Sequence, residues 1–173
     1  MKTGLITVGV IVAGVVGYFL YVGAFTGVRI EEQDRPPIAF VYRDIAGSEM
    51  SLIGPTTDQL DTLLRSAGVA NRKPLDIFYP DGRAEIGFAI EGASDAQLAS
   101  LGAAAKSRVI PAQRYMASSF PWTSSASYMI GYMKVDPALA KWRASHHYKK
   151  VEAFALNEGK TILYLQPVVP AAP

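Results

Sequence analysis

The residue best placed for chemistry is an acid, Glu152, because it lies in a segment (149–156) with the alternating pattern of a β-strand. A carboxylate there either faces solvent or enters an apolar cleft. In a cleft it needs a cation as partner, because burying an unpaired charge is costly. The residues alone leave both positions open. Asp76 presents the same choice, and we expect it at the surface, because acids are rarely buried without a partner.

Other groups of reactive residues predict no catalytic or metal site. His146 and His147 are adjacent, so their side chains diverge, whereas two metal ligands on one helix usually lie four residues apart. The chain has no cysteine, which excludes thiolate nucleophiles and cysteine-bound metals. Ser124 opens a serine-rich stretch without a nucleophile elbow, and it serves more simply as a helix cap. We therefore predict no catalytic residue, no metal and no cofactor.

The composition favours one domain without a nucleic-acid partner. The chain has 173 residues and a formal net charge of only +2. Its length suits a single domain, since domains typically hold about 100–150 residues. Binding of nucleic acid usually needs a basic stripe, and no long basic tract is present.

The N-terminal segment is strongly apolar. Residues 5–25 contain no charged side chain and are dominated by Val, Leu, Ile, Gly and Ala. A helix of this length would reach about 31 Å, close to the thickness of a bilayer's hydrocarbon core. We therefore predict a transmembrane anchor over residues 1–26, in contact with the lipid bilayer through residues 5–25. Gly9, Ala13 and Gly17 recur every four residues, a spacing that would also suit weak self-association of such helices.

A cleaved signal peptide is the alternative for this segment. Lys2 supplies a short positive start, and residues 22–24 (Val-Gly-Ala) have an A-x-A-like pattern. The apolar run is longer than the usual signal-peptide core of about 7–15 residues, which favours retention. The positive-inside rule then favours a single-pass membrane protein with its following domain on the extracytoplasmic side.

Strand and helix patterns alternate through residues 27–169, which we predict to be one domain, followed by a loose tail over 170–173. Alternation, helical spacing and turn residues carry these assignments. Strands are expected at 38–45, 73–79, 83–90, 149–156 and 160–168, and residues 28–34 as a short strand or linker. Helices are expected from Pro55 to a stop at Gly68, from Ser94, and over 124–147, the last either continuous or broken at Asp136-Pro137. Residues 108–120 read as one long strand or a bent pair.

Both halves of this domain run strand, helix, hairpin. Aligning residues 73–83 with 149–160 matches lysine, acid, aromatic and turn residues, and it sets Asp76 opposite Glu152. We predict an α+β fold in which duplicated β-α-β-β units form a curved antiparallel sheet with helices on one face. The other face would be concave, and one transmembrane helix would precede the whole.

Four short motifs in fixed order carry a family resemblance. They are residues 27–30 (Gly-Val-Arg-Ile) leading to 36–38 (Pro-Pro-Ile), 120–123 (Phe-Pro-Trp-Thr), 135–139 (Val-Asp-Pro-Ala-Leu), and the strand 148–154. The chain resembles the GyrI-like, SOUL-like effector-binding superfamily, which includes gyrase-inhibitory proteins and the ligand domains of AraC- and MerR-type regulators. With its apolar start it is most similar to the membrane-anchored branch, typified by the testis-expressed ER-phagy receptor. It has neither a helix-turn-helix nor a long acidic tail, so the resemblance implies neither transcriptional regulation nor a role in autophagy.

The resemblance implies a cleft between two repeats that takes small, often cationic or aromatic, ligands, with Glu152 as its acid. Flat walls and cation–π faces would come from six aromatic residues: Phe40, Tyr42, Tyr79, Trp122, Tyr148 and Phe154. Strand register decides which of these point inward. We therefore expect a membrane-anchored, noncatalytic small-molecule-binding domain. Two alternatives stay open: a hydrolase of small electrophiles using the same cleft, and a membrane-tethered module for protein interaction.

Overall fold

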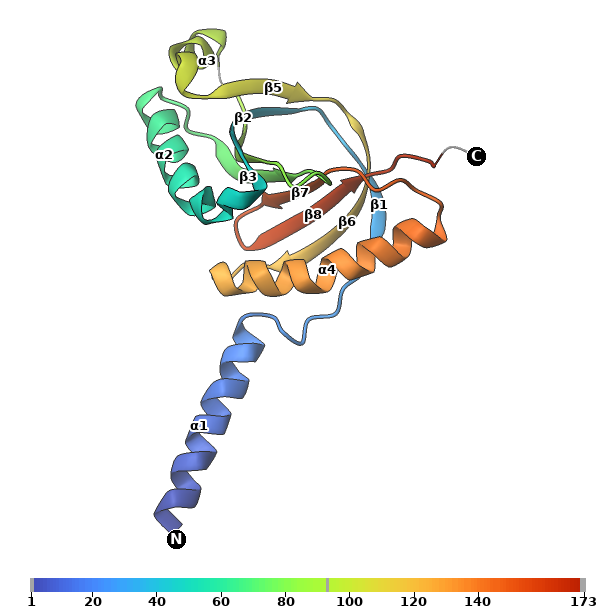
Figure 1. The fold of residues 1–173 in the computed structure, drawn as a ribbon. Coiled ribbons are helices and arrows are strands. Elements are labelled where there is room, and N and C mark those ends of the chain that lie inside the picture. Colours follow the sequence, from blue (N-terminus) through green and yellow to red (C-terminus); the bar gives the residue numbers. More distant parts are fainter. Residues whose placement is uncertain (1, 93, 172–173) are drawn as a thin grey trace.

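The structure, a computed structural model, describes the backbone of residues 2–92 and 94–171 and the side chains of these ranges except residues 2–10 and Asp95. Helix α1 (Lys2–Tyr21) projects away from a body made of a curled sheet and further helices (Figure 1). The helices of the body are α2 (Ile53–Ser66), α3 (Asp95–Ser100) and α4 (Ser125–Ser145), with 3-10 turns η1 (Gly47–Leu52) and η2 (Gly102–Ala104). The strands are β1 (Glu31–Arg35), β2 (Ile38–Ile45), β3 (Arg72–Phe78), β4 (Ala84–Ile90), β5 (Lys106–Ile110), β6 (Gln113–Pro121), β7 (Ala153–Asn157) and β8 (Thr161–Pro167).

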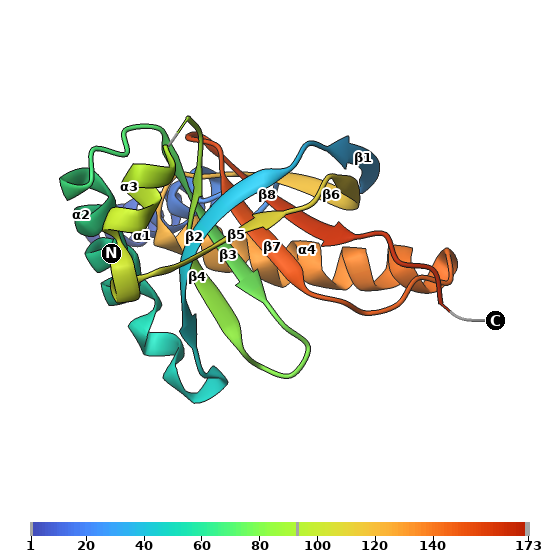
Figure 2. The same ribbon diagram turned by 90° about the horizontal axis from the view of Figure 1, so that it is seen from above.

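The strands form one 8-stranded sheet in the order β1-β6-β8-β7-β3-β4-β2-β5. This order is symmetrical about the junction of β3 and β7, so β2, β4 and β3 mirror β6, β8 and β7. The edge strands are exchanged between the halves, because β1 pairs with β6 and β5 pairs with β2. All pairings between the named strands are antiparallel. Seen from above, the sheet is strongly twisted and curls around its own interior (Figure 2).

Local sequence signals set several of the element boundaries. Gly68 has a φ of 74° directly after α2, and Gly82 has a φ of 88° in the turn between β3 and β4. Left-handed backbone of this kind favours glycine, which has no Cβ to clash. The side chain of Ser94 accepts a hydrogen bond from the backbone of Gln97 and caps α3. The helix start predicted at Ser94 and the helix stop predicted at Gly68 are therefore confirmed.

Alternation of side chains divides the residues of the sheet between two faces. On one face α2 packs against Val41 and Phe88, and α4 packs against Phe120 and Tyr164. Both long helices of the body therefore cover the same face. The opposite, concave face has its own apolar core, formed by Phe40, Leu75, Ile77, Ala89, Ile110, Tyr115, Ala117, Phe154, Leu156, Leu163 and Leu165. The curl of the sheet brings these side chains together, so the concave face is filled by its own residues.

Helix α4 lies very close to the sheet at Gly131. A Cβ added there would lie 2.5 Å from the hydroxyl oxygen of Tyr164 and 2.9 Å from a ring atom of Phe120. The hydroxyl of Tyr164 donates a hydrogen bond of 2.8 Å to the backbone oxygen of Tyr128, one turn earlier on α4. Glycine therefore sets the distance between the helix and strands β6 and β8.

The structure decides two alternatives that the sequence left open, and it differs from the sequence predictions in two further details. Residues 108–120 contribute to two strands in opposite halves of the sheet, because β5 pairs with β2 while β6 pairs with β8. Helix α4 is continuous through Pro137, which lies on its exposed side. Strand β7 begins only at Ala153, so Glu152 precedes it. Asp76 lies inside β3 and pairs with Ala155, so Asp76 and Glu152 do not occupy equivalent positions in the two halves.

The junction between α1 and the body is closely packed. Val22 is completely buried, and the ammonium of Lys134 on α4 donates hydrogen bonds to the backbone oxygens of Ala24 (2.7 Å) and Thr26 (2.5 Å). The hydroxyls of Tyr21 and Thr123 each donate to the other residue's backbone oxygen. The direction in which α1 leaves the body is therefore held by α4 and by the segment that precedes it.

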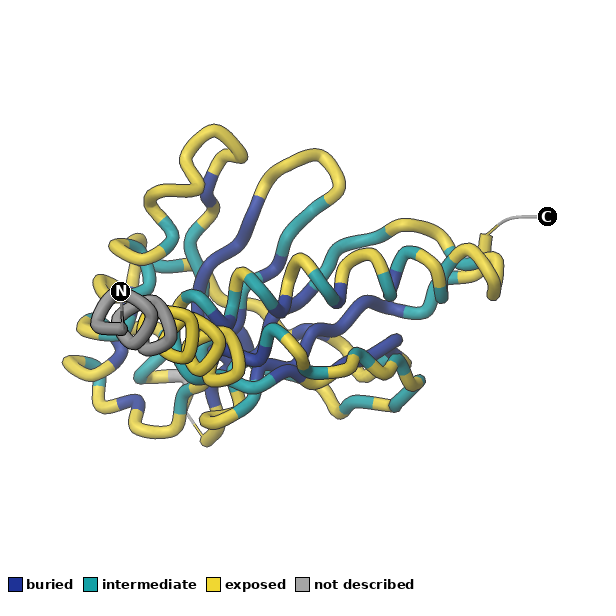
Figure 3. Tube along the Cα trace, turned by 90° about the horizontal axis from the view of Figure 1, so that it is seen from below, coloured by how far each residue is buried: buried dark blue, intermediate teal, exposed yellow. Residues whose placement is uncertain are grey.

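From residue 11 to residue 21 the side chains of α1 are exposed (Figure 3). Within the residues that the structure describes, no helix combines the length and the hydropathy needed to cross a bilayer. The transmembrane span over residues 5–25 stays a prediction. The packing face expected from Gly9, Ala13 and Gly17 falls partly on residues whose side chains lie outside the described set.

Candidate ligand-binding face

The concave face brings together four of the six aromatic residues expected to line a cleft. Phe40 and Phe154 are buried there, and Tyr42 and Tyr79 pack against the same core. The rings of Phe40 and Tyr42 stack at a centroid distance of 5.0 Å with planes 8° apart. Phe154 meets Tyr115, which the sequence did not single out, edge to face at 5.5 Å. Phe40, Phe154 and Tyr115 are buried within this core, whereas Tyr42 and Tyr79 are partly exposed and present the accessible aromatic surface of the face.

Glu152 lies near this face. It stands two residues before the buried Phe154, in the segment that leads into β7. Burial raises the pKa of Tyr115, a hydrogen bond from Gln113 lowers it, and the negative charge of Glu152 raises it, so the carboxylate lies within electrostatic range of the phenol. Glu152 is partly exposed. It therefore combines access to solvent with an aromatic neighbour, as a ligand-pairing acid requires.

A second acid, Glu85, is more deeply placed on the concave face. Every residue of β4 is buried, and Glu85 is 7 % exposed. Its carboxylate accepts a hydrogen bond of 2.6 Å from the guanidinium of Arg108, with which it forms an ion pair. The same nitrogen of Arg108 donates to the hydroxyl of Tyr79 at 2.9 Å. Burial, and then contact with Glu85, raises the pKa of Tyr79 to about 12, so this phenol stays protonated at neutral pH.

Sequence reasoning missed Glu85, although a signal was present. Apart from Glu85, the segment 84–90 contains only apolar residues and glycine, so it resembles a strand buried on both faces. An acid in such a strand needs a partner, since an isolated buried carboxylate is strongly disfavoured. The partner comes from β5, and its identity depends on a strand pairing that the sequence does not show.

Trp122 and Tyr148 lie on the other face of the sheet. Both pack into the core beneath α4. Trp122 meets Tyr128 edge to face at 6.4 Å. The ring of His146 stacks between Trp142 (4.5 Å) and Tyr148 (5.6 Å), and the hydroxyl of Tyr148 donates to Glu32 at 2.8 Å. The structure therefore does not bring these two residues together with Glu152.

Asp76 was expected at the surface, but it lies on the helix-covered face at the centre of the sheet. Burial raises its pKa to about 7, while hydrogen bonding by Gly87 and the nearby hydroxyl of Tyr128 oppose that rise. The Tyr128 hydroxyl is itself buried without a partner within hydrogen-bond distance among the described residues.

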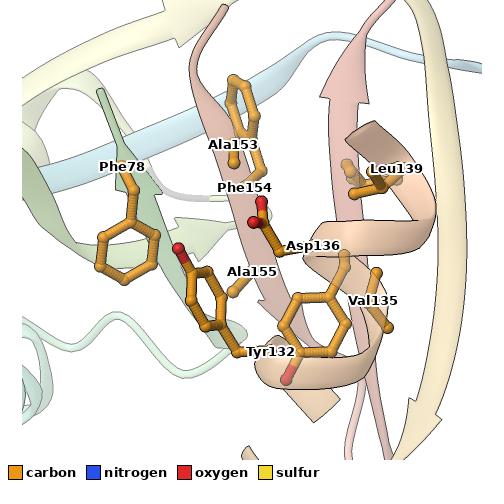
Figure 4. Close-up of a pocket in the computed structure, with 10 residues that line it drawn as sticks. Phe78, Tyr132, Val135, Asp136, Leu139, Ala153, Phe154 and Ala155 are labelled. Atoms are coloured by element: carbon orange, nitrogen blue, oxygen red, sulfur yellow. The ribbon is translucent and has the colours of Figure 1, made fainter. Parts of the chain in front are cut away.

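Neither Glu152 nor Glu85 lines the cavity beneath α4 or the one at the rim of the concave face. The one beneath α4, lined by Phe78, Tyr132 and Asp136 among others, holds about 20 Å³, room for about one water molecule (Figure 4). The other, of about 150 Å³, lies at the far rim of the concave face, between Pro36-Pro37 and Leu156. In the part of the chain that the structure describes, no three His, Asp or Glu side chains gather closely enough to hold a metal ion.

No family model matches the sequence, and no curated protein matches it. Solved structures do match the fold. SAV2435 bound to tetraphenylphosphonium is 13% identical, with a TM-score of 0.61 over 81% of this chain and 93% of that one. The C-terminal domain of EcmrR is 11% identical, with a TM-score of 0.61 over 83% and 99%. An integron cassette protein from Vibrio cholerae is 10% identical, with a TM-score of 0.55 over 83% and 96%. At these identities the likeness concerns the fold alone, and the chain shares the fold of these solved proteins.

Proposed function

We propose that this chain binds small organic cations on the concave face of its sheet and does so without chemical turnover. The observation that carries the proposal is that the charge of the partly exposed Glu152 acts on the phenol of Tyr115, whose ring packs in the concave core with Phe154 and Tyr79. A partly exposed carboxylate beside aromatic rings attracts a cation by charge and by cation–π contact. The fold neighbour solved with tetraphenylphosphonium, a lipophilic aromatic cation, supports this ligand class.

The test is calorimetric titration of the full chain with tetraphenylphosphonium. Tetraphenylborate, which has nearly the same shape and the opposite charge, serves as the ligand control. We expect saturable binding of the cation alone, weakened at least tenfold by Glu152→Gln. Glu49→Gln changes an exposed acid in η1 and should leave the affinity unchanged. Equal affinity in the wild-type chain and Glu152→Gln would show that Glu152 does not face the ligand.

We further propose that residues 5–25 anchor the domain to a membrane, with the domain on the extracytoplasmic side. The uncharged sequence supports this, together with the exposed apolar side chains of Ile11, Val12 and Leu20 on α1. The full chain should stay in the membrane fraction after alkaline carbonate extraction, and a chain lacking residues 2–20 should not. Reporter fusions at each end test the orientation, and a cytoplasmic signal from the C-terminal fusion would reverse it.

A further inference from the structure

Arg108 is held by contacts that together resemble a binding site for an organic cation. Its guanidinium meets the Glu85 carboxylate at 2.6 Å and the Tyr79 hydroxyl at 2.9 Å, and it lies 5.6 Å from the centre of the Tyr42 ring. A carboxylate, a phenol oxygen and an aromatic face are the groups with which proteins bind guanidinium and ammonium ligands. The cation in this site belongs to the chain itself.

The two ends of this ion pair are unequally buried. The side chain of Glu85 is 9% exposed, whereas that of Arg108 is 39% exposed. Glu85 therefore depends on a cation from outside β4, because its own strand is buried along its whole length. Arg108 can reach water by rotating its long side chain, so its charge is solvated when it leaves these contacts. A ligand that approached from solvent would meet the arginine first and the acid behind it.

Departure of Arg108 does not require β5 to move. β5 is an edge strand, and Lys106 to Val109 are exposed. The strand is held independently by its pairing with β2, by the buried Ile110 and by the ion pair of Lys106 with Asp44. The arginine side chain alone can swing out, which leaves the carboxylate, the phenol and the Tyr42 ring in place.

We propose that Glu85, Tyr42 and Tyr79 form a subsite for a planar organic cation of the amidinium or guanidinium class, which Arg108 occupies in the free chain. The resident group defines this class, since a planar donor of hydrogen bonds satisfies the acid and the phenol together. The inference deepens the proposed function and rests on it for the concave face as the ligand side. Arg108 is then an internal competitor, and ligand binding requires its release. Because a tethered competitor acts at an effective concentration in the millimolar range, the wild-type chain should bind such cations weakly.

The experiment uses benzamidine as probe and neutral benzamide, of nearly the same shape, as control. Arg108→Ala should bind benzamidine at least tenfold more tightly than the wild-type chain, and neither should bind benzamide. Adding Glu85→Gln to Arg108→Ala should abolish the gain. Arg114→Ala removes another paired, exposed arginine of the sheet and should leave the affinity unchanged. A gain that survives without the Glu85 charge, or no gain in a folded Arg108→Ala chain, overturns the proposal.

Shortening Arg108 to alanine can itself create a hole that binds benzamidine, or can unfold the chain. Displacement of the Arg108 side chain is therefore also followed in the wild-type chain by NMR. Saturating benzamidine should shift the guanidinium Nε–H signal of Arg108 and leave that of Arg114 in place. An unmoved Arg108 signal overturns the proposal whether or not the variant folds. The benzamidine experiment and the Glu152→Gln titration test different claims. Loss of tetraphenylphosphonium binding in Glu152→Gln supports the proposed function even if benzamidine never displaces Arg108.

Discussion

Asp76 and Ala155 face each other across the junction of β3 and β7, so a carboxyl group lies at the centre of the sheet. The position is covered by helices, and burial raises the pKa of Asp76 from 3.8 to about 7. This carboxyl is neutral in the folded chain at pH values where it is ionised in the unfolded chain. The free energy of unfolding therefore depends on pH through a group at the centre of the sheet.

The stability of the wild-type chain should fall as pH rises from about 4 to above 7. A group whose pKa is raised by folding stabilises the fold below its unfolded pKa, and this contribution is lost as pH passes its folded pKa. Asp76→Asn should remove the decline and stabilise the chain at pH 8 by roughly 3–4 kcal/mol relative to wild type. Urea unfolding across this pH range measures the effect. Asp58→Asn, which changes an exposed acid of α2, is the control. Identical pH slopes for wild type and Asp76→Asn would refute the assignment.

Gly87→Ala should destabilise the domain by about 3 kcal/mol or more. A Cβ at this position would overlap the backbone oxygen of Val41 and lie 2.8 Å from the Cα of Tyr42, and neither atom can move without breaking the pairing of β2 with β4. Thermal unfolding followed by circular dichroism gives the measurement. Gly54→Ala, in α2 with open space around it, should instead raise stability by about 0.5–1 kcal/mol. Similar melting temperatures for the two variants would contradict this account.

Gly131→Ala should weaken the packing of α4, since the new methyl group would crowd the hydroxyl of Tyr164 and the ring of Phe120. We expect a loss of about 1–3 kcal/mol. Combining it with Tyr164→Phe removes the nearer obstacle, so the two changes together should cost less than the sum of their separate effects. A double-mutant cycle in urea tests this, and strict additivity would exclude a shared contact.

Lys134→Met should loosen the junction between α1 and the body while leaving the sheet intact. The ammonium bonds two backbone oxygens, and losing both contacts should cost about 1–3 kcal/mol locally. Amide exchange at Ala24 and Thr26 should then quicken by roughly tenfold or more, with core strands unaffected. Lys141→Met, on the exposed side of the same helix, is the control. Unchanged exchange at these amides would mean that the bonds do not hold the junction.

Much of the fold could be predicted because its signals are local. The strand expected at 38–45 coincides with β2, and the hairpin around residues 80–82 joins β3 and β4 as expected. The alternation that separates the two faces within each strand is likewise readable from the sequence. What could not be predicted depends on pairing between distant segments. The separation of β5 from β6 follows from partners in opposite halves of the sheet, which no local pattern records.

The candidate site was predictable in part, for the same reason. Phe40, Tyr42, Tyr79 and Phe154 gather on the concave face as expected, whereas the role of Glu152 as the ligand acid stays a prediction. Trp122 and Tyr148 were assigned to the same cleft, but they pack beneath α4, because strand register determines the face and the sequence does not give register. Asp76 was placed at the surface on the general behaviour of acids, and its position between two buried strands overrides that tendency.

The exchange of edge strands also has a consequence for synthesis. β1 leaves the ribosome early, but its partner β6 follows some eighty residues later, and β2 receives its second neighbour only when β5 has been made. Neither half can complete its hydrogen bonding alone, so the chain must remain partly open until most of it has emerged. Such long-range closure slows folding and leaves β1 and β2 with unpaired edges in the meantime. A nascent domain of this architecture should therefore depend on chaperones more than its size suggests.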